Sequence, residues 1–464
     1  MKAPRLKAGG SAGEVLRPAK KKDLEKLGLP TERPADWKAV ALAKLEELVR
    51  TRRGLRIFMD DCVQCGACAD KCPFFLGTGD PNNMPVGRAE LFRKVYRRHF
   101  TASGKLFRGL ADAEELSEET LQTWYTYFYQ CSECRRCAVY CPYGIDTAEV
   151  TRAAREVLAS VGLAPQYVTE VVAKVYDFGN NLGIPKAAWI DSCRFLEEEM
   201  KEETGLPIRI PVDEKGADVL LVPPSADLFA NTNTMIGYAK IFHAAGISWT
   251  TSTYASEAGN FGLFLTEEHL RRCAQRIVDA ARELGVARIV AGECGHGWRA
   301  TGTLLRDLCG PLDFLEDKNP LHIVEVTAGF LSAGRIRLDA SRGRSGIVTY
   351  HDPCNVARAG GLIEEPRILL RSAVRSFVEM PADTIRERTL CCGAGGGLLA
   401  DELMGLRMKG ARARVEALRV TGAGTLATIC AICKAQFPHV FSHYKLDVEV
   451  AGVTDLVAEA LVMG

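Results

Sequence analysis

The sequence lacks any uninterrupted apolar run of 18 or more residues, although 47% of its 464 residues are hydrophobic. A helix needs about 20 apolar residues to cross a bilayer, so we expect no direct membrane span. Residues 1–18 contain lysines and glycines but no apolar core of a secretion signal. The formal net charge is only +1, which gives no field that would attract nucleic acid. We therefore expect a cytoplasmic protein that binds no nucleic acid and that reaches the inner face of the cytoplasmic membrane through partner subunits.

A dinucleotide-binding turn is also missing. No Gly-x-Gly-x-x-Gly sequence stands between an expected strand and an expected helix. We therefore expect no flavin on this chain, and any flavin chemistry would belong to a partner.

Cysteine, in contrast, is abundant: 13 of the 17 cysteines fall into three ordered sets. The first two sets both have the spacing Cys-x2-Cys-x2-Cys-x3-Cys-Pro, which is the ligand run of two-cluster ferredoxins. They are Cys62, Cys65, Cys68 and Cys72, and Cys131, Cys134, Cys137 and Cys141. Cysteine-rich secreted proteins are usually short and disulfide-bonded, so a long chain with tight metal-ligand spacings favours a reducing compartment.

In a ferredoxin, three closely spaced thiolates hold one cluster and the fourth cysteine of the run binds the other cluster. The first [4Fe-4S] cluster is therefore expected at Cys62, Cys65, Cys68 and Cys141, and the second at Cys131, Cys134, Cys137 and Cys72. Structural zinc is the alternative, because it also uses four thiolates, but zinc sites normally present two Cys-x2-Cys pairs rather than triplets.

The third set consists of Cys354, the adjacent pair Cys391–Cys392 followed by Gly393, and Cys430-x2-Cys433. Five thiolates exceed the four that a cubane needs, which suggests a cluster that also performs chemistry. Adjacent cysteines suit an enlarged or opened cluster, with one terminal and one bridging sulfur. Glycines after the pair let the backbone approach the sulfides and donate to them. A vicinal disulfide and a zinc site remain alternatives.

The C-terminal half reads as two copies of one unit. Residues 219–225 correspond to 347–353, residues 253–259 to 389–395, and residues 289–296 to 426–433. Short apolar strands alternate with helical patterns, for example at 267–284 and 403–418, which predicts parallel sheets flanked by helices. Sites on such sheets form at the carboxyl ends of the strands, where these motifs stand.

The expected fold is therefore a multidomain α+β and α/β protein, in which a helical ferredoxin-like domain precedes two pseudo-symmetric α/β lobes. Its expected parts are an N-terminal tail and amphipathic helix (1–54), the two-cluster domain (55–155), a helical connector (156–215), a degenerate repeat (216–340) and a complete repeat (341–464). Helices are expected near 36–53, 86–100 and 121–129.

The three cysteine sets together resemble the CCG-domain proteins related to the catalytic subunit of heterodisulfide reductase. The layout is most similar to the DsrK-like branch, the cytoplasmic subunits of DsrMKJOP-type membrane complexes of dissimilatory sulfur metabolism. This resemblance implies an oxidoreductase acting on a sulfur group, with two cubane [4Fe-4S] clusters and one noncubane [4Fe-4S] cluster. It also implies a cytochrome b-type membrane partner (DsrM-like), other subunits of such a complex, and a small sulfur-carrier protein (DsrC-like) whose disulfide or trisulfide is reduced or formed.

The first repeat departs from the fuller pattern of that family. Ala226 stands opposite Cys354, and Ala255–Ser256 stand opposite the cysteine pair. We therefore expect one noncubane cluster rather than two.

Glu293, Cys294 and His296 remain at a strand end of the first repeat. Because disulfide reduction consumes protons, we expect Glu293 and His296 to act as candidate proton donors there. Hydrogen-bonded remnants of a lost site are the alternative.

Another class of function stays open. The iron–sulfur subunits of glycolate, lactate or glycerol-3-phosphate dehydrogenases join two ferredoxin runs to CCG repeats in a similar way, and they only transfer electrons to quinone.

Overall fold

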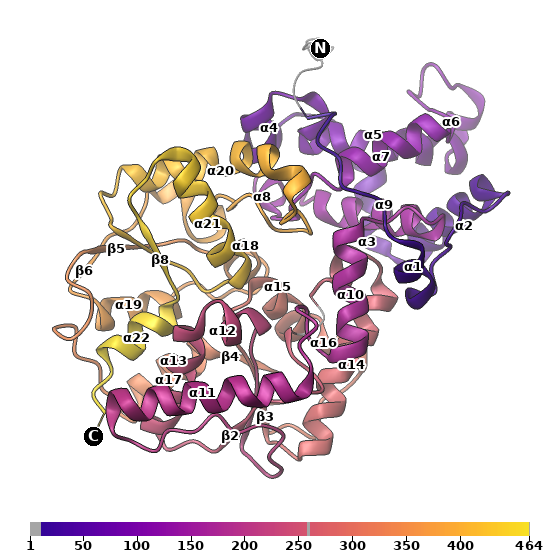
Figure 1. The fold of residues 1–464 in the computed structure, drawn as a ribbon. Coiled ribbons are helices and arrows are strands. Elements are labelled where there is room, and N and C mark those ends of the chain that lie inside the picture. Colours follow the sequence, from indigo (N-terminus) through magenta and orange to yellow (C-terminus); the bar gives the residue numbers. More distant parts are fainter. Residues whose placement is uncertain (1–10, 258–259, 464) are drawn as a thin grey trace. The chain divides into compact units, whose positions relative to one another are not determined.

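The structure is a computed structural model that describes residues 11–257 and 260–463 (Figure 1). Expectations for residues 1–10 of the tail, and for Ala258 and Gly259 at the end of a repeat motif, lie outside the described residues. The chain forms two compact units. Unit 1 comprises Met1–Ala173, Leu263–Glu267 and Leu390–Arg414, and unit 2 comprises Lys174–Gly262, Glu268–Thr389 and Val415–Gly464.

Unit 1 is built from helices. In order they are α1 (Lys21–Leu27), α2 (Trp37–Thr51), α3 (Arg53–Asp60), α4 (Pro73–Thr78), α5 (Pro85–Phe100), α6 (Ala102–Leu106), α7 (Glu118–Phe128), α8 (Arg136–Val139) and α9 (Thr147–Ser160), followed by α10 (Gln166–Phe178), which continues into unit 2. The helices expected near 36–53, 86–100 and 121–129 are thereby confirmed.

The helices of unit 1 begin at polar caps and bury one apolar face. Ser117 caps α7 by accepting a hydrogen bond from Thr120 N, and Asp146 caps α9 by accepting one from Ala148 N. Helix α2 packs against α9 with its buried residues Ala41, Leu45 and Leu48. Its apolar stripe is therefore used inside unit 1.

Residues 11–35 do not behave as a tail. Helix α1 buries Leu24 and Leu27, and Leu16 belongs to the same hydrophobic core as α2 and α9. Gln130 Nε2 donates to Ser11 O at 2.7 Å. The prediction of a tail before the amphipathic helix is wrong for these residues, because three apolar side chains and buried polar contacts attach them to unit 1.

Unit 2 contains two parallel sheets with the same strand order. The first sheet has the order β2-β1-β3-β4 and the second β6-β5-β7-β8. Their strands are β1 (Val219–Val222), β2 (Trp249–Thr250), β3 (Arg288–Ala291), β4 (Leu321–His322), β5 (Ile347–Tyr350), β6 (Ser376–Phe377), β7 (Thr425–Ala427) and β8 (Glu449–Ala451). The central pairs align Leu221 with Val290 and Thr349 with Leu426. The predicted parallel sheets are confirmed; a pseudo-twofold axis between the lobes stays a prediction.

Helices surround these strands. They are α11 (Lys186–Thr204), α12 (Ser225–Phe229), α13 (Thr232–Ala245), α14 (Glu267–Leu284), α15 (Gly295–Trp298), α16 (Leu305–Cys309), α17 (Ile323–Ser332), α18 (Cys354–Ala357), α19 (Glu365–Ala373), α20 (Met404–Arg419), α21 (Ala431–Tyr444) and α22 (Val453–Ala460). Helix α13 packs against α22, and α19 packs against both α17 and α22. Helices that follow strands of different sheets thus share one core.

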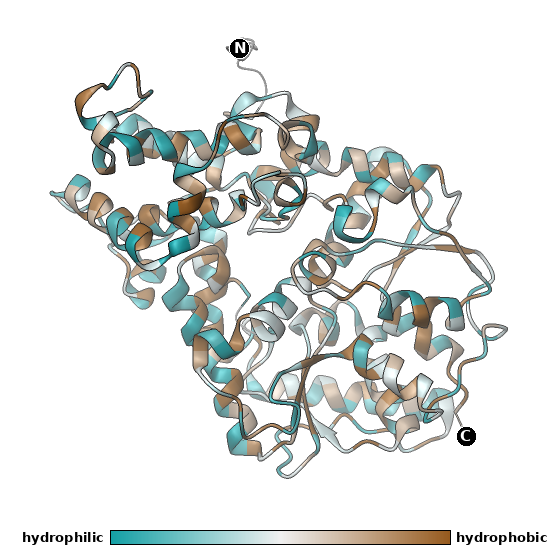
Figure 2. Ribbon diagram, turned by 180° about the vertical axis from the view of Figure 1, so that it is seen from behind, coloured by the Kyte–Doolittle hydropathy of each residue, from teal (hydrophilic) through white to brown (hydrophobic). Residues whose placement is uncertain are grey.

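Hydropathy follows this arrangement. Figure 2 shows hydrophilic and hydrophobic residues alternating around the helices. Strand β1 is buried at all four residues, as expected for a parallel strand covered on both faces. Within the described residues, no helix has the length and apolar character needed to cross a membrane.

A buried cation joins the two lobes of unit 2. Lys434 of α21 is 5% exposed, and its Nζ lies 3.0 Å from Glu293 Oε2 and 3.4 Å from Asp227 Oδ1. Lys434 Nζ also donates to Thr234 Oγ1 at 2.8 Å. Thr454 N donates to the second Glu293 oxygen at 2.7 Å. Lys434 therefore compensates two carboxylates that have no exposed surface.

We expect Lys434→Met to lower the free energy of unfolding by about 3–5 kcal/mol, the usual cost of removing one partner of a buried ion pair. The control is Lys186→Met, because Lys186 is largely exposed and its Nζ pairs with Asp213 Oδ2 at 3.0 Å. That control should lose at most about 1 kcal/mol. The midpoint of urea unfolding of the intact chain measures both, and equal midpoints would contradict the structural role of Lys434.

The stability of Lys434→Met should change with pH in a defined direction. Burial raises the pKa of Glu293 to about 7 and that of Asp227 to about 6. An acid whose pKa is raised in the folded state binds its proton better there, so its contribution to stability falls as pH rises from its ordinary pKa to the raised one. Without the Lys434 charge this fall should be steeper between about pH 4.5 and 7.

Candidate functional site

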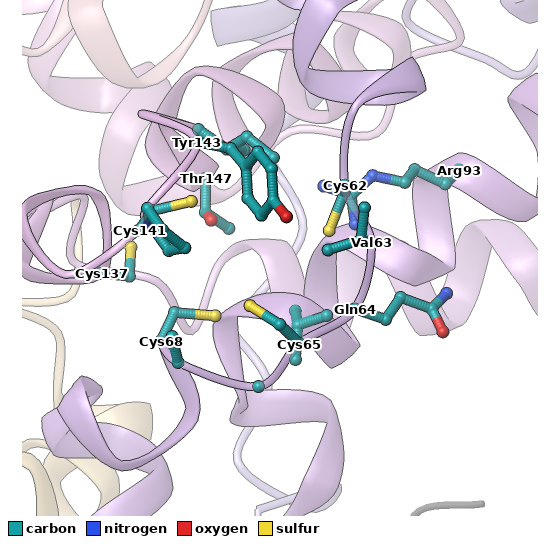
Figure 3. A pocket seen from close by; sticks show the side chains of 15 residues that line it. Cys62, Val63, Gln64, Cys65, Cys68, Arg93, Cys137, Cys141, Tyr143 and Thr147 are labelled. Carbon is teal, nitrogen blue, oxygen red and sulfur yellow. The ribbon is translucent and has the colours of Figure 1, made fainter. Parts of the chain in front are cut away.

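Four cysteines of the two ferredoxin runs surround one cavity in unit 1. Cys62, Cys65 and Cys68 follow α3, Cys141 follows α8, and all four line one pocket, which Cys137 of the second expected set also lines. Figure 3 shows their sulfurs directed into this common space. The turn needs positive φ angles at Gln64 (54°) and at Gly66 (79°), a conformation for which glycine has no steric penalty.

The donor set of this cavity fits an iron–sulfur cluster. Burial raises the pKa of Cys68 to about 11, with Cys62 and Cys141 as further negative neighbours. Sulfurs in that environment become thiolates only if a positive centre compensates their charge, as iron does. The three-plus-one combination is the set expected from ferredoxin spacing.

The remaining four cysteines of the runs are also neighbours in unit 1. Burial raises the pKa of Cys72 to about 11, and Cys134 and Cys131 add to this rise while Arg88 opposes it. Burial likewise raises the pKa of Cys137 well above its ordinary value, and Cys134, Cys131 and Cys72 act on it. The structure therefore brings Cys72, Cys131, Cys134 and Cys137 near one another, and Asp146 also raises the pKa of Cys137.

The cysteine pair of the third set lies in unit 1, on the loop before α20. Cys391 and Cys392 are buried. Gly393 N donates to Cys391 Sγ at 3.3 Å, as expected if glycine brings backbone amides to the sulfur. Cys391 Sγ also lies 3.2 Å from Ser132 Oγ, in the loop of the second four-sulfur set.

The other three cysteines of the third set lie in unit 2, at the carboxyl ends of strands. Cys354 begins α18 after β5, and Cys430 is the N-cap residue of α21 after β7. A hydrogen bond from Cys433, together with backbone amides that include Gly295 N, lowers the pKa of Cys430 to about 7 despite its burial. Cys430 is thus prepared to act as a thiolate ligand.

Cys294 of the degenerate repeat lies beside Cys430. A Cβ atom added to Gly295 would lie 3.4 Å from Cys430 Sγ. Asn260 Nδ2 and Gly297 N each donate to Cys294 Sγ at 3.3 Å. Burial and the neighbouring Cys430 raise the pKa of Cys294. The structure therefore brings Cys294 close to a ligand of the expected third cluster, within unit 2.

Glu293 and His296, the two expected proton donors, are both buried. Glu293 is bound by Lys434 and Thr454 in the buried network described above. Burial and Arg299 lower the pKa of His296 to about 3, so its imidazole is neutral at physiological pH. The expectation for His296 depends on the reference pKa of histidine, which is near neutral. The proton-donor roles of Glu293 and His296 stay predictions.

Three buried, ion-paired residues near the cysteines escape the sequence motifs. Lys434 follows Cys433 directly, and a lysine inside an apolar helical segment is a signal of a buried ion pair. Arg155 follows two alanines in α9 and gives the same signal, while its partner Glu133 stands between two cluster cysteines. Charged residues at such positions are rarely buried without a partner.

Comparison with known proteins agrees with these motifs. Residues 58–145 match the 4Fe-4S dicluster domain family, and residues 348–438 match the cysteine-rich domain family of CCG proteins. The chain is 43% identical to the Hdr-like menaquinol oxidoreductase iron-sulfur subunit 2 of Archaeoglobus fulgidus, over 93% of this chain and 84% of that protein.

Two more distant relatives match most of this chain. One subunit of the dihydromethanophenazine:CoB–CoM heterodisulfide reductase of Methanosarcina mazei is 26% identical, over 87% of this chain and 94% of that protein. The EtfAB:quinone oxidoreductase of Syntrophomonas wolfei is 25% identical, over 73% of this chain and 48% of that protein. The expectation of an iron–sulfur oxidoreductase subunit with a CCG domain is confirmed, and the chain belongs to the family of iron–sulfur subunits of Hdr-like menaquinol oxidoreductases.

Proposed function

We propose that this subunit carries electrons through two cubane [4Fe-4S] clusters to or from a noncubane [4Fe-4S] cluster. The first cubane is bound by Cys62, Cys65, Cys68 and Cys141, and the second by Cys72, Cys131, Cys134 and Cys137. The noncubane cluster is bound by Cys354, Cys391, Cys392, Cys430 and Cys433. The observation that carries the proposal is the gathering of both ferredoxin runs in unit 1, where Ser132, the neighbour of Cys131, contacts Cys391 of the cysteine pair.

The clusters, when bound, supply one-electron redox chemistry. The chain supplies thiolates at defined positions, amides that donate to sulfur, such as Gly393 N and Glu133 N, and burial that excludes water.

We further propose that the reaction at the noncubane cluster reduces or forms a disulfide or trisulfide on a small thiol carrier protein, as in the DsrK-like branch. The heterodisulfide reductase relative supports a sulfur-group reaction by its name. Glu293 and His296 are the candidate proton donors of this reaction.

The alternative is electron transfer alone, between a flavin-containing partner and quinone. The EtfAB:quinone oxidoreductase relative favours it, because its name describes such a transfer. The two functions differ in whether the third cluster reacts with a disulfide.

A membrane partner is proposed from the exposed rim of the first cavity. Cys65 is exposed, and beside it Val63 and Tyr143 keep 60% and 54% of their surface accessible. An exposed cluster edge ringed by apolar side chains fits a protein that brings a one-electron carrier close, such as a cytochrome b-type subunit that exchanges electrons with menaquinol. The stripe on α2 is used inside unit 1, so this rim is the better docking candidate.

The cluster assignment predicts roughly twelve irons and twelve acid-labile sulfides per chain in anaerobically purified protein. Iron and sulfide assays on the intact chain measure this number. A fully loaded preparation that contains only about eight irons would leave no third cluster, although the two cubanes would stand.

Cys392→Ser should abolish turnover with a disulfide-bearing carrier protein, while dithionite still reduces both cubane clusters. The reason is that Cys392 belongs to a different cluster from the two ferredoxin runs. Cys309→Ser is the matched control, because Cys309 lies in α16 outside all three sets and should leave turnover normal. Turnover of Cys392→Ser at the normal rate would refute the assignment of Cys392 to the reacting cluster. A wild-type chain with no turnover on the carrier protein would refute the sulfur-group reaction and leave electron transfer alone.

Val63→Glu should weaken retention on membranes by at least about tenfold, because it places a charge in the apolar rim. Val420→Glu is the control, since Val420 is 71% exposed and belongs to unit 2. Sedimentation of each variant with membranes that contain the partner subunits measures the effect. Equal retention of both variants would place the contact elsewhere.

A further inference from the structure

Two loops that carry cysteines of different expected clusters touch each other inside unit 1. One loop carries Cys131 of the second ferredoxin run, and the other carries Cys391 of the pair. Ser132 Oγ and Cys391 Sγ are 3.2 Å apart, and both residues are buried. When Cys391 is a thiolate, the Ser132 hydroxyl can donate to it. One residue of backbone and one hydrogen bond therefore separate Cys131 from Cys391.

The backbones of the two loops are also in contact. A Cβ atom at Gly396 would lie 2.6 Å from Cys131 O and 2.8 Å from the backbone of Ser132. Gly396 has a φ of +69°, which adds strain for any other residue. Only glycine allows this approach.

The Arg155 side chain of α9 donates hydrogen bonds to both loops. Its Nη1 donates to Gly396 O at 2.9 Å on one loop, and its Nη2 donates to Cys131 O at 2.8 Å on the other. Nη1 also donates to Glu133 Oε1 at 2.8 Å, in an ion pair with no exposed surface on either side chain.

Further contacts hold the Arg155 guanidinium in place. Nε and Nη2 donate to Phe128 O at 3.2 and 2.9 Å, and the group lies 4.7 Å from the Tyr129 ring centroid. This set of contacts requires a planar fork of donors, which arginine has and lysine lacks.

We propose that the contact between Ser132 and Cys391 is the junction through which electrons pass between the second cubane and the cluster of the cysteine pair, and that Arg155 is the positioning residue that keeps this junction closed. The inference rests on the proposed function. One electron crosses at a time, no bond forms or breaks, and no proton is needed. Arg155 and Glu133 compensate each other, so Arg155 acts on the gap between the loops rather than through a net charge.

The distance across the junction decides its rate, because electron transfer slows steeply as the gap between donor and acceptor widens. Arg155→Lys keeps the charge but cannot bridge Gly396, Cys131 and Glu133 together. Gly396→Ala pushes the loops apart by a clash that does not involve Arg155. Both variants should slow electron transfer to the third cluster severalfold, because each widens the gap between the two loops.

The test uses the intact, cluster-loaded chain. Rapid-freeze EPR follows electrons from the reduced cubanes to the third cluster, and EPR of the partly reduced protein reports the magnetic interaction between neighbouring clusters. Both variants should keep the iron content and the reduction potentials of the wild type, with slower transfer and a weaker interaction. Gly109→Ala is the control, because a Cβ there meets nothing within 4 Å and the residue lies in unit 1.

Ser132→Ala is a milder third variant, since it removes one hydroxyl and no backbone contact. If Gly396→Ala fails to load iron, Arg155→Lys and Ser132→Ala decide the matter. Transfer at the wild-type rate in these loaded variants would overturn the junction. A wild-type chain without a third cluster would instead overturn the proposed function, and the iron assay distinguishes the two failures.

Discussion

Unit 1 gathers the eight cysteines of the two ferredoxin runs, although burial opposes the ionisation of several of them. The raised pKa values of Cys68 and Cys72, each about 11, express this opposition. Iron supplies the compensating charge, so cluster binding and the packing of unit 1 are linked. We therefore expect the helices around the cysteines to pack stably only when the iron–sulfur clusters are bound. The short turn with positive φ angles at Gln64 and Gly66 carries Cys62, Cys65 and Cys68 to one pocket.

In unit 2 the buried groups that need charge compensation are carboxylates, and a lysine side chain compensates them. Lys434 of the second lobe stands one residue after Cys433 and pairs with Glu293 and Asp227 of the first lobe. The strand end that carries Cys294 is therefore tied to the helix that carries Cys430 and Cys433. Charge compensation within the protein fixes the positions of cysteines at this edge, as the Arg155–Glu133 pair does in unit 1.

Spacing and periodicity predict local structure, but contacts between distant segments are not visible in them. The ferredoxin runs predict which cysteines are neighbours, and the apolar runs at 219–222 and 347–350 predict strands whose carboxyl ends carry the motifs. No local pattern shows that the His296 ring is enclosed, or that Leu16 finds a core formed by later helices. The approach of Gly396 to Cys131 joins residues 265 positions apart, from 396 minus 131, and only the glycine-rich composition of that loop suggests it.

Mössbauer spectroscopy of the intact chain loaded with iron-57 tests the central claim most directly. Two cubanes and one noncubane cluster predict that roughly two thirds of the iron gives the signal of ordinary [4Fe-4S] clusters and roughly one third gives a separate signal. The separate signal should change when a disulfide-bearing carrier protein is added. A spectrum in which all iron belongs to ordinary cubanes, with or without the carrier, would contradict the account.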